Sequence, residues 1–352
     1  MTIETEIAPA IDYNSIKEEA ELLAYEPPPQ SAFAVKSAAD WLAIAKNQRV
    51  PKKLFDEFWY ESELCFLFAD TNAGKSILAV QIAEMIASGK SEAEAQKVLY
   101  FDFELSAKQF ERRYCQIIKT DDKEIYGNHY DFSERFFRVE VDIDAMQPER
   151  FKTEAEWLDF SFNLALAESE ARIIIVDNIT YMRNELEKSG IASEMMKLLK
   201  TLKKKYDLSI LALGHTPKRD LSKPISKNDL GGSKMLINFA DSCFAIGESF
   251  KDKNLRYLKQ IKTRNGEHRY DAENVYVHQI AKDYNFLEFQ PLDYAPEKEH
   301  LKSLTDKERG ELPEQIRNLK NMLGLSQREI AKRLGISPST VNKYLKADGD
   351  VK

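Results

Sequence analysis

A Gly-Lys-Ser triplet, residues 74–76, follows a short apolar run and opens an amphipathic stretch. In a phosphate-binding loop, backbone N–H groups wrap the phosphates and the start of the next helix adds its positive end. Lys75 would reach the β- and γ-phosphates of ATP, Ser76 would hold Mg²⁺, and Gly74 would let the backbone approach the ligand. The pattern predicts a nucleotide site made by Ala69, Asp70, Thr71, Asn72, Ala73, Gly74, Lys75, Ser76 and Ile77.

Ala69 stands where such loops carry their first glycine. Alanine is small, so the loop can close if residue 69 keeps an ordinary φ. The alternative is a chance Gly-Lys-Ser at the start of a helix. The apolar run before it and the helical pattern after it favour a working loop, so we expect Ala69→Gly to change nucleotide affinity little.

Two carboxylates end other apolar runs. Asp177 closes ARIIIVD, where a carboxylate can hold Mg²⁺ through water, and Glu104 follows KVLYFDF, where it could polarise an attacking water. Ligands bind at the carboxyl edge of a parallel sheet, so both are expected near the loop. The alternatives are an Asp that caps the next element and a surface Glu in the turn before a helix near Ser106.

The elements that position these residues follow from periodicity. The runs LCFLFA, KVLYFDF, ARIIIVD and LSILALG alternate with amphipathic helical stretches at 75–88, 106–120, 153–170 and 191–205. This order is typical of an α/β fold with a parallel sheet covered on both faces. After residue 241, the runs SCFAIGES, LRYLKQIKTR, NVYVHQI and YNFLEF are separated by short turns, which predicts antiparallel strands that extend the sheet.

The length of 352 residues suits one large domain and a small one. We predict an N-terminal arm or small subdomain at 1–50, an ATPase domain at 51–292, a charged linker at 293–312 and a small all-α domain at 313–352. The three cysteines lack metal-ligand or disulfide spacing, and no apolar run approaches membrane length. The first residues lack a signal pattern, so the protein is expected in the cytoplasm, with no membrane partner.

The net charge of −7 requires any nucleic-acid contact to be local. One candidate is the loop HTPKRDLSKPISKNDLGGSK, which can track a phosphate backbone; the alternative is a solvated surface loop. Its cations are Lys218, Arg219, Lys223, Lys227 and Lys234.

The segment LSQREIAKRLGISPSTVNKYL resembles a helix-turn-helix. Ser326 would cap a helix, Gly335 would make the turn, and Ser337-Pro338 would start a second helix with Val341 on its inner face. The alternative is a helical hairpin for protein contacts. The predicted groove-facing residues are Ser339, Thr340, Asn342 and Lys343.

The order of these motifs over roughly residues 54–289 resembles the RecA-like ATPases, and most of all the hexameric replicative helicases of the DnaB and plasmid RepA type. The resemblance implies that Glu104 is the catalytic carboxylate, as in the helicase LEMS motif, which reads FELS here. It implies that His215 senses the γ-phosphate. It also implies that Lys262 and Arg264 of KTRNG enter the nucleotide site of the neighbouring subunit.

The fold expected from this resemblance is a RecA-like doubly wound, mainly parallel sheet with an antiparallel extension, plus the C-terminal helix-turn-helix. The expected function is that of a DNA-dependent ATPase with ATP and Mg²⁺, a replicative helicase of a plasmid or mobile element. Its partners would be single-stranded DNA, a duplex site, further copies in a hexameric ring, and a primase or replication initiator. The open alternatives are an ATP-switched DNA-binding regulator and a RecA/RadA-like recombination ATPase that forms filaments.

Overall fold

The computed structural model describes residues 33–120, 123–142, 144–179, 191–216, 219–229, 234–302, 306–334, 336 and 338–347. Of several residues in these ranges only the backbone is described, including 191–195, 234–236, 306–313, 339, 340 and 343. Among the residues described, none of the helices is both long and apolar enough to cross a membrane.

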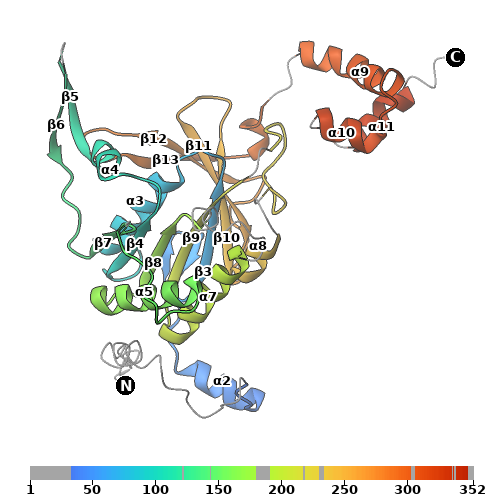
Figure 1. Cartoon of the computed structure of the whole chain (residues 1–352). Coiled ribbons are helices and arrows are strands. Elements are labelled where there is room, and N and C mark those ends of the chain that lie inside the picture. The colour runs from blue at the N-terminus through green and yellow to red at the C-terminus, as the bar shows by residue number, and fades with distance from the viewer. Residues whose placement is uncertain are drawn as a thin grey trace.

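A central sheet organises the large domain (Figure 1). Within the described residues it has nine strands in the order β13-β12-β11-β10-β3-β9-β8-β4-β7. Its parallel part consists of β10 (Ser242–Glu248), β3 (Leu64–Ala69), β9 (Ser209–His215), β8 (Ile173–Asp177), β4 (Val98–Asp102) and β7 (Phe136–Val139). The chain leaves β3 and returns in β4, three positions along the sheet with β9 and β8 between them, so a topological switch point lies beside the end of β3. The predicted α/β fold with a mainly parallel sheet is confirmed.

The extension of the sheet differs from the prediction in one strand. As expected, β11 (Leu255–Lys262), β12 (Val275–Ala281) and β13 (Glu288–Ala295) are antiparallel to their neighbours. The prediction was wrong for β10, which is parallel to β3. Helix α8 (Lys234–Phe239) lies between β9 and β10 along the chain, and a connection of this kind allows a parallel return where a tight turn would not.

The prediction of a helix over 106–120 was wrong for the second half of that segment. Helix α4 (Ala107–Arg113) ends early, and β5 (Cys115–Lys119) pairs with β6 (Glu124–His129) in a separate antiparallel ribbon. The run CQIIK carries two adjacent isoleucines, and Ile118 lies opposite Ile125 in the ribbon. Cross-strand packing of β-branched residues therefore outweighs the helical pattern that precedes them.

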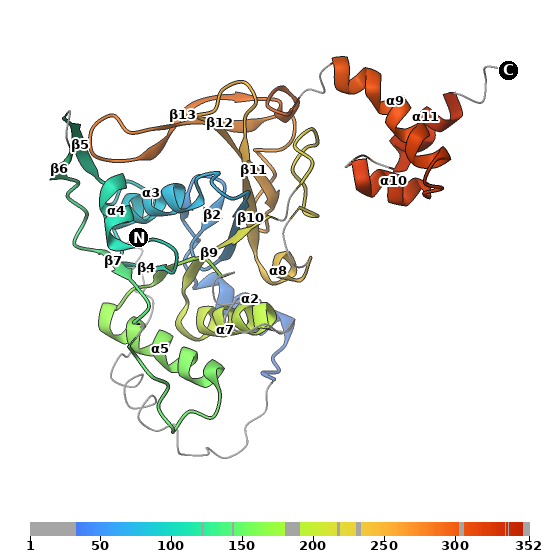
Figure 2. The ribbon, with the colours of Figure 1, turned by 45° about the horizontal axis from the view of Figure 1, so that its top comes forward.

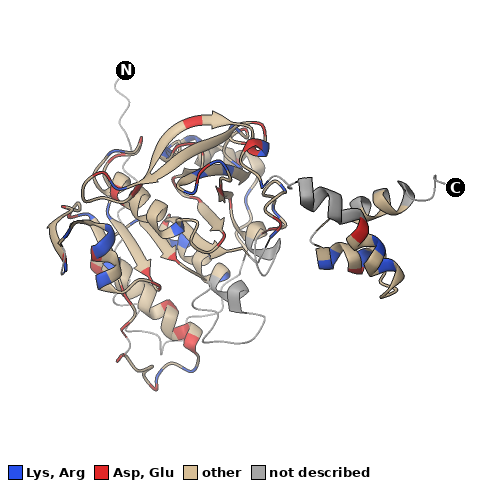
Figure 3. Cartoon of the chain, turned by 90° about the horizontal axis from the view of Figure 1, so that it is seen from above, with Lys and Arg blue, Asp and Glu red and all other residues tan. Residues whose placement is uncertain are grey.

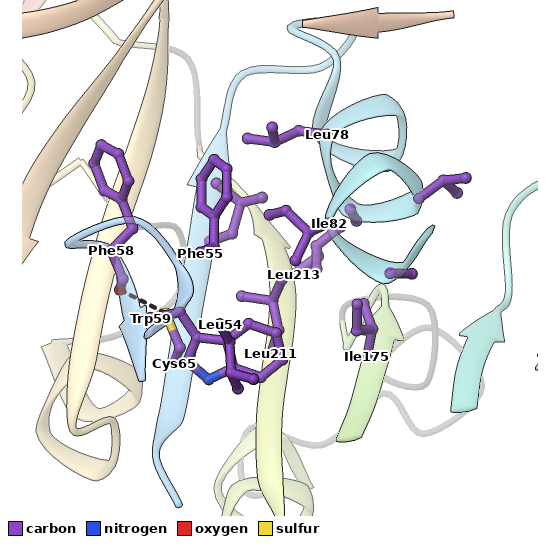
Figure 4. Packing of buried hydrophobic residues seen from close by; sticks show 14 of the residues in the cluster. Leu54, Phe55, Phe58, Trp59, Cys65, Leu78, Ile82, Ile175, Leu211 and Leu213 are labelled. Atoms are coloured by element: carbon purple, nitrogen blue, oxygen red, sulfur yellow. Dashed lines mark hydrogen bonds between the residues drawn. The ribbon is translucent and has the colours of Figure 1, made fainter. Parts of the chain in front are cut away.

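The helices expected on both sides of the sheet are present as α3 (Lys75–Ala87), α5 (Glu154–Ser169) and α7 (Ile191–Tyr206). Alternate residues of β3 enter different cores: Leu67 joins the cluster on the α3 face, whereas Phe66 joins the one around α5 and α7. Figure 4 shows Leu78 and Ile82 of α3 lying over Leu211 and Leu213 of β9 and Ile175 of β8. Burial on both faces explains why the strands are nearly continuous apolar runs.

The hairpin made by β12 and β13 extends beyond the sheet and covers α3 on the side that faces away from β9 and β8 (Figure 2). The Gln81 amide exchanges hydrogen bonds with the backbone N–H and C=O of Phe289, at 2.8 and 3.0 Å. At the tip of the hairpin, Lys282 donates to Arg112 O and Asn285 donates to Asn128 O. The antiparallel end of the sheet is thereby tied to the β5–β6 ribbon, with α3 enclosed between them.

Two smaller parts complete the described chain. Strands β1 (Lys53–Phe55) and β2 (Trp59–Tyr60) form a short hairpin, and α2 (Ala38–Lys46) buries none of its residues.

The 3-10 turn η1 (Glu297–Glu299) follows β13. Helices α9 (Asp306–Asn321), α10 (Gln327–Leu334) and α11 (Pro338–Ala347) then share a core of Ile316, Ile330, Ala331 and Val341. The ordered elements β13 and α9 thus extend into the segment predicted as linker.

Candidate functional site

The phosphate-binding loop joins β3 to α3 at the switch point. Gly74 caps α3 with φ +103°, and a Cβ there would lie 2.9 Å from the Phe289 ring and 3.1 Å from Ile280. Asn72 is also left-handed, at φ 66°, whereas Ala69 is not among the positive-φ residues. Glycine is therefore required at position 74, and the backbone at position 69 is one that alanine adopts without strain.

Lys75 is almost fully buried at the start of α3. Its ammonium donates to Ala69 O and Asp70 O, each at 3.1 Å, and contacts His215 Nδ1 at 2.9 Å. Burial lowers the pKa of Lys75, while Asp177, Glu104 and Asp70 oppose that shift. The oxygens of a phosphate bound at this loop could replace the backbone carbonyls as acceptors of the Lys75 ammonium.

Glu104, His215 and Asn178 meet at the carboxyl ends of β4, β9 and β8. His215 Nε2 lies 3.1 Å from Glu104 Oε1, and the Asn178 amide nitrogen donates to the same oxygen. The Lys75 ammonium can only donate, so His215 Nδ1 must accept and Nε2 must carry the proton. One directed chain of hydrogen bonds therefore runs from Lys75 through His215 to Glu104.

The hydrogen bond from His215 is the largest cause of the lowered pKa of Glu104, and Lys75 and Asn178 act in the same direction. Glu104 is thus held as a carboxylate that can accept a hydrogen bond from water. The sequence reasoning did not identify Asn178, which is 1% exposed. Its place directly after a strand-ending aspartate was the available signal.

Asp102 and Arg138 shape the turn that presents Glu104. Asp102 Oδ1 accepts from the N–H groups of Glu104 and Leu105, at 3.2 and 2.9 Å. Arg138 Nε donates to Asp102 Oδ2 at 2.9 Å, and its NH2 donates to Leu105 O at 2.6 Å. This fixed turn on β4 and β7 was also missed from the sequence, because the pairing of β7 with β4 has no local signal.

Asp177 ends β8 and is fully buried. Tyr100 donates to Asp177 Oδ2 at 2.6 Å, whereas Oδ1 has no partner among the described residues. Burial raises the pKa of Asp177 to about 6, and the nearby hydroxyls of Ser76 and Tyr100 oppose that rise. Mg²⁺ prefers oxygen ligands and usually keeps several waters, so the unpaired oxygen of Asp177, a carboxylate close to Ser76, fits this ion. No cluster of three His, Cys, Asp or Glu residues suited to a metal occurs in the described chain.

The basic loop after β9 is packed more tightly than the sequence suggested. Arg219 is buried: its Nε lies 3.2 Å from Asp70 Oδ2, and its NH1 donates to Lys223 O. Thr216 donates to the other Asp70 oxygen. Arg219 therefore holds the phosphate loop in this structure and does not present its guanidinium to DNA.

A buried ion pair fixes the middle of the same loop. Glu297 accepts from Lys259 at 2.5 Å and from Ile225 N at 2.6 Å, and Lys259 also donates to Ile225 O. Lys223 and Lys227 remain exposed, although Lys223 pairs with Asp220. Lys218 lies outside the described residues, as does the side chain of Lys234.

Lys262 and Arg264 lie far from the phosphate loop of their own chain. Lys262 pairs with Cys243 at the start of β10. Because β10 is parallel to β3, this start lies at the edge of the sheet opposite to the phosphate loop. Its ammonium donates to Ile237 O and Ala240 O at the end of α8, and Arg264 donates to Asp241 Oδ1 at 2.9 Å. The structure therefore does not bring these two residues together with Lys75 and Glu104.

The C-terminal helices have the order and core predicted for a helix-turn-helix. Ser326 Oγ accepts from Glu329 N, and Glu329 in turn accepts from Ser326 N. Of the four predicted groove-facing residues, Asn342 is partly exposed, and the side chains of Ser339, Thr340 and Lys343 lie outside the described set. Along the ribbon of the large domain, Lys and Arg positions are interspersed with Asp and Glu positions (Figure 3).

Two parts of this chain match known protein families. The AAA domain family matches residues 28–220, more than half of the chain, and a helix-turn-helix family matches residues 316–351. A solved KaiC-like protein of the hyperthermophilic archaeon Pyrococcus horikoshii OT3 is 14% identical, with a TM-score of 0.47, over 66% of this chain and 91% of that one. None of the curated proteins is similar enough to count as a relative. The chain therefore belongs to the AAA domain family, as a P-loop ATPase domain followed by a helix-turn-helix DNA-binding domain.

Proposed function

We propose that this protein is a DNA-dependent ATPase that works as a motor on single-stranded DNA. The observation that carries the proposal is the chain of hydrogen bonds from Lys75 through His215 to Glu104, beside the unpaired oxygen of Asp177. Lys75, Glu104 and Asp177 lie together at one end of the sheet, and this supports a site in which a cation binds phosphate, a carboxylate orients water and a second carboxylate holds a metal ion, as phosphoryl transfer to water requires.

In this proposal the backbone of residues 69–76 binds the phosphates of ATP and Lys75 neutralises the β- and γ-phosphates. Ser76 and, through water, Asp177 would hold Mg²⁺, which would supply positive charge beside the transferred phosphate. Glu104 orients the attacking water by accepting a hydrogen bond from it. His215 links Glu104 to Lys75, so that contact of Lys75 with a γ-phosphate changes the hydrogen bonding of Glu104.

The proposal includes an oligomer. Because Lys262 and Arg264 lie at the sheet edge opposite to their own loop, they could act on a nucleotide only in a neighbouring copy. By resemblance to replicative helicases, we propose a hexameric ring in which these residues complete the adjacent site. The release of Lys262 from α8 and of Arg264 from Asp241 is then part of the catalytic cycle.

DNA contacts are divided between two places in this proposal. The exposed Lys223 and Lys227, with Lys218 and Lys234, would follow single-stranded DNA along the loop after β9. The helix-turn-helix would bind duplex DNA through Ser339, Thr340, Asn342 and Lys343. A plasmid or mobile-element helicase, with a primase or replication initiator as partner in the cytoplasm, is the specific role we propose by resemblance.

A regulatory switch is the second candidate function. The burial of Arg219 against Asp70 and the ion pair beneath Ile225 favour it, because a loop held in this way is less free to travel along DNA. In a regulator, ATP would control the oligomeric state and the helix-turn-helix would bind an operator. A recombination ATPase is a third candidate function. Electron microscopy would distinguish it from the proposed motor, because a recombination ATPase would form filaments and the motor would form rings.

Steady-state ATP hydrolysis measured alone, with single-stranded DNA and with duplex DNA tests the motor proposal. We expect stimulation by single strands and strand displacement by the assembled protein. Matched variants Lys227→Ala, on the exposed loop, and Lys90→Ala, on the surface beyond α3, separate local DNA contact from general loss of charge. Hydrolysis that responds only to duplex DNA, with no strand displacement, would favour the regulator.

A further inference from the structure

Tyr100 is a fully buried tyrosine of β4 that the proposed mechanism does not use. It lies in the strand next to Asp177, in register with Ile175 of β8. Its hydroxyl donates to Asp177 Oδ2 at 2.6 Å, and its ring packs edge-on against Phe136 at a centroid distance of 5.9 Å. A ring enclosed in this way cannot move its hydroxyl far, so the donor has a fixed position.

The two oxygens of Asp177 therefore differ. Oδ2 is occupied by Tyr100, whereas Oδ1 is buried and has no partner among the described residues. A carboxylate can rotate about its Cβ–Cγ bond, and a single short hydrogen bond to one oxygen fixes the direction of the other. Outer-shell partners of this kind orient metal-binding carboxylates, and their loss typically costs about 10- to 100-fold in metal affinity.

We propose that Tyr100 is a positioning residue for the Mg²⁺ that accompanies the nucleotide: it holds Asp177 Oδ2 so that Oδ1 is presented to the water that links Asp177 to the ion. The proposal rests on the nucleotide site of the proposed function, and it requires neither DNA nor oligomer contacts.

Tyr114 provides a matched comparison. It is also almost fully buried, and Asp177 and Asp102 are close enough to contribute to its raised pKa, whose main cause is burial. Its hydroxyl has no partner among the described residues. Removal of the Tyr114 hydroxyl thus removes a buried polar group near the same acids without removing a hydrogen bond to Asp177.

The test is a Mg²⁺ titration of the binding of a fluorescent ADP analogue to the full-length protein, with binding in EDTA as the reference. We expect Tyr100→Phe to raise the half-saturating Mg²⁺ concentration by about 10-fold or more and to leave affinity in EDTA unchanged. Tyr114→Phe should change both by less than about twofold. Equal Mg²⁺ midpoints for wild type and Tyr100→Phe, or an equal shift in Tyr114→Phe, would overturn the proposal.

If Tyr100→Phe does not fold, 4-aminophenylalanine and 4-fluorophenylalanine at position 100 replace it. They are similar in size, but only the amino group donates a hydrogen bond. We expect a Mg²⁺ midpoint about 10-fold lower for the amino form, and equal midpoints would overturn the proposal. Absence of ADP binding by the wild type both in EDTA and at saturating Mg²⁺ would refute the nucleotide site itself, an outcome distinct from either result.

Discussion

Replacement of His215 by phenylalanine tests the chain of hydrogen bonds at the site. The change removes the donor to Glu104 Oε1 at 3.1 Å and an acceptor of Lys75, which keeps its bonds to Ala69 O and Asp70 O. A hydrogen bond to a charged group contributes about 1.5–3 kcal/mol. Since the Glu104 side chain is 34% exposed, solvent screening favours the lower end, which corresponds to about a 10-fold loss in kcat.

The same change predicts a shift in pH dependence. His215 is the largest cause of the lowered pKa of Glu104, so its removal should raise that pKa. The ionised carboxylate is the active form, and activity is lost as pH falls through its pKa. The acid limb of the rate profile should therefore move to higher pH in the variant.

The assay is steady-state ATP hydrolysis between pH 4.5 and 8, with ADP affinity measured in parallel. His129→Phe is the control, because His129 lies 2.9 Å from Glu111 in an exposed pair outside the site. We expect wild-type kinetics in that control. A His215→Phe enzyme with kcat within twofold of wild type, or with an unmoved acid limb, would refute the reasoning.

Three further predictions concern the loop and its supports. Gly74→Ala should lower the free energy of unfolding by about 1–3 kcal/mol in urea denaturation, because of φ +103° and the contact with Phe289; an unchanged midpoint would contradict the described loop geometry. Ala69→Gly should change ADP affinity, measured by fluorescence, by less than about threefold, whereas a large gain would mean that the native loop is impaired. Lys259→Met should destabilise the protein by about 3–5 kcal/mol because it leaves Glu297 charged and buried, and a near-neutral result in calorimetry would show that Glu297 is protonated or solvated.

Much of the site could be predicted from the sequence because its residues end apolar strands. Asp177, Glu104 and His215 each follow such a run, and a parallel sheet brings the carboxyl ends of its strands to one edge. The helix-turn-helix was also predictable, since its cap, turn and inner apolar positions are local in the chain.

The remaining features depend on contacts between distant segments. Arg219 looked like a surface cation, but its partner Asp70 lies about 150 positions earlier in the chain and no local pattern links them. The parallel direction of β10 depends on how α8 crosses the sheet. The break at Cys115 depends on pairing with β6, because cross-strand contacts determine whether an ambiguous apolar run becomes a strand.

The most direct test of the central claim is ATP turnover by Glu104→Gln beside the wild type, with nucleotide binding measured on the same samples. If Glu104 orients the attacking water, the variant should lose about 100-fold or more in kcat and keep its affinity for ATP. Hydrolysis by Glu104→Gln at a rate close to wild type would contradict the assignment of Glu104 and the mechanism built on it.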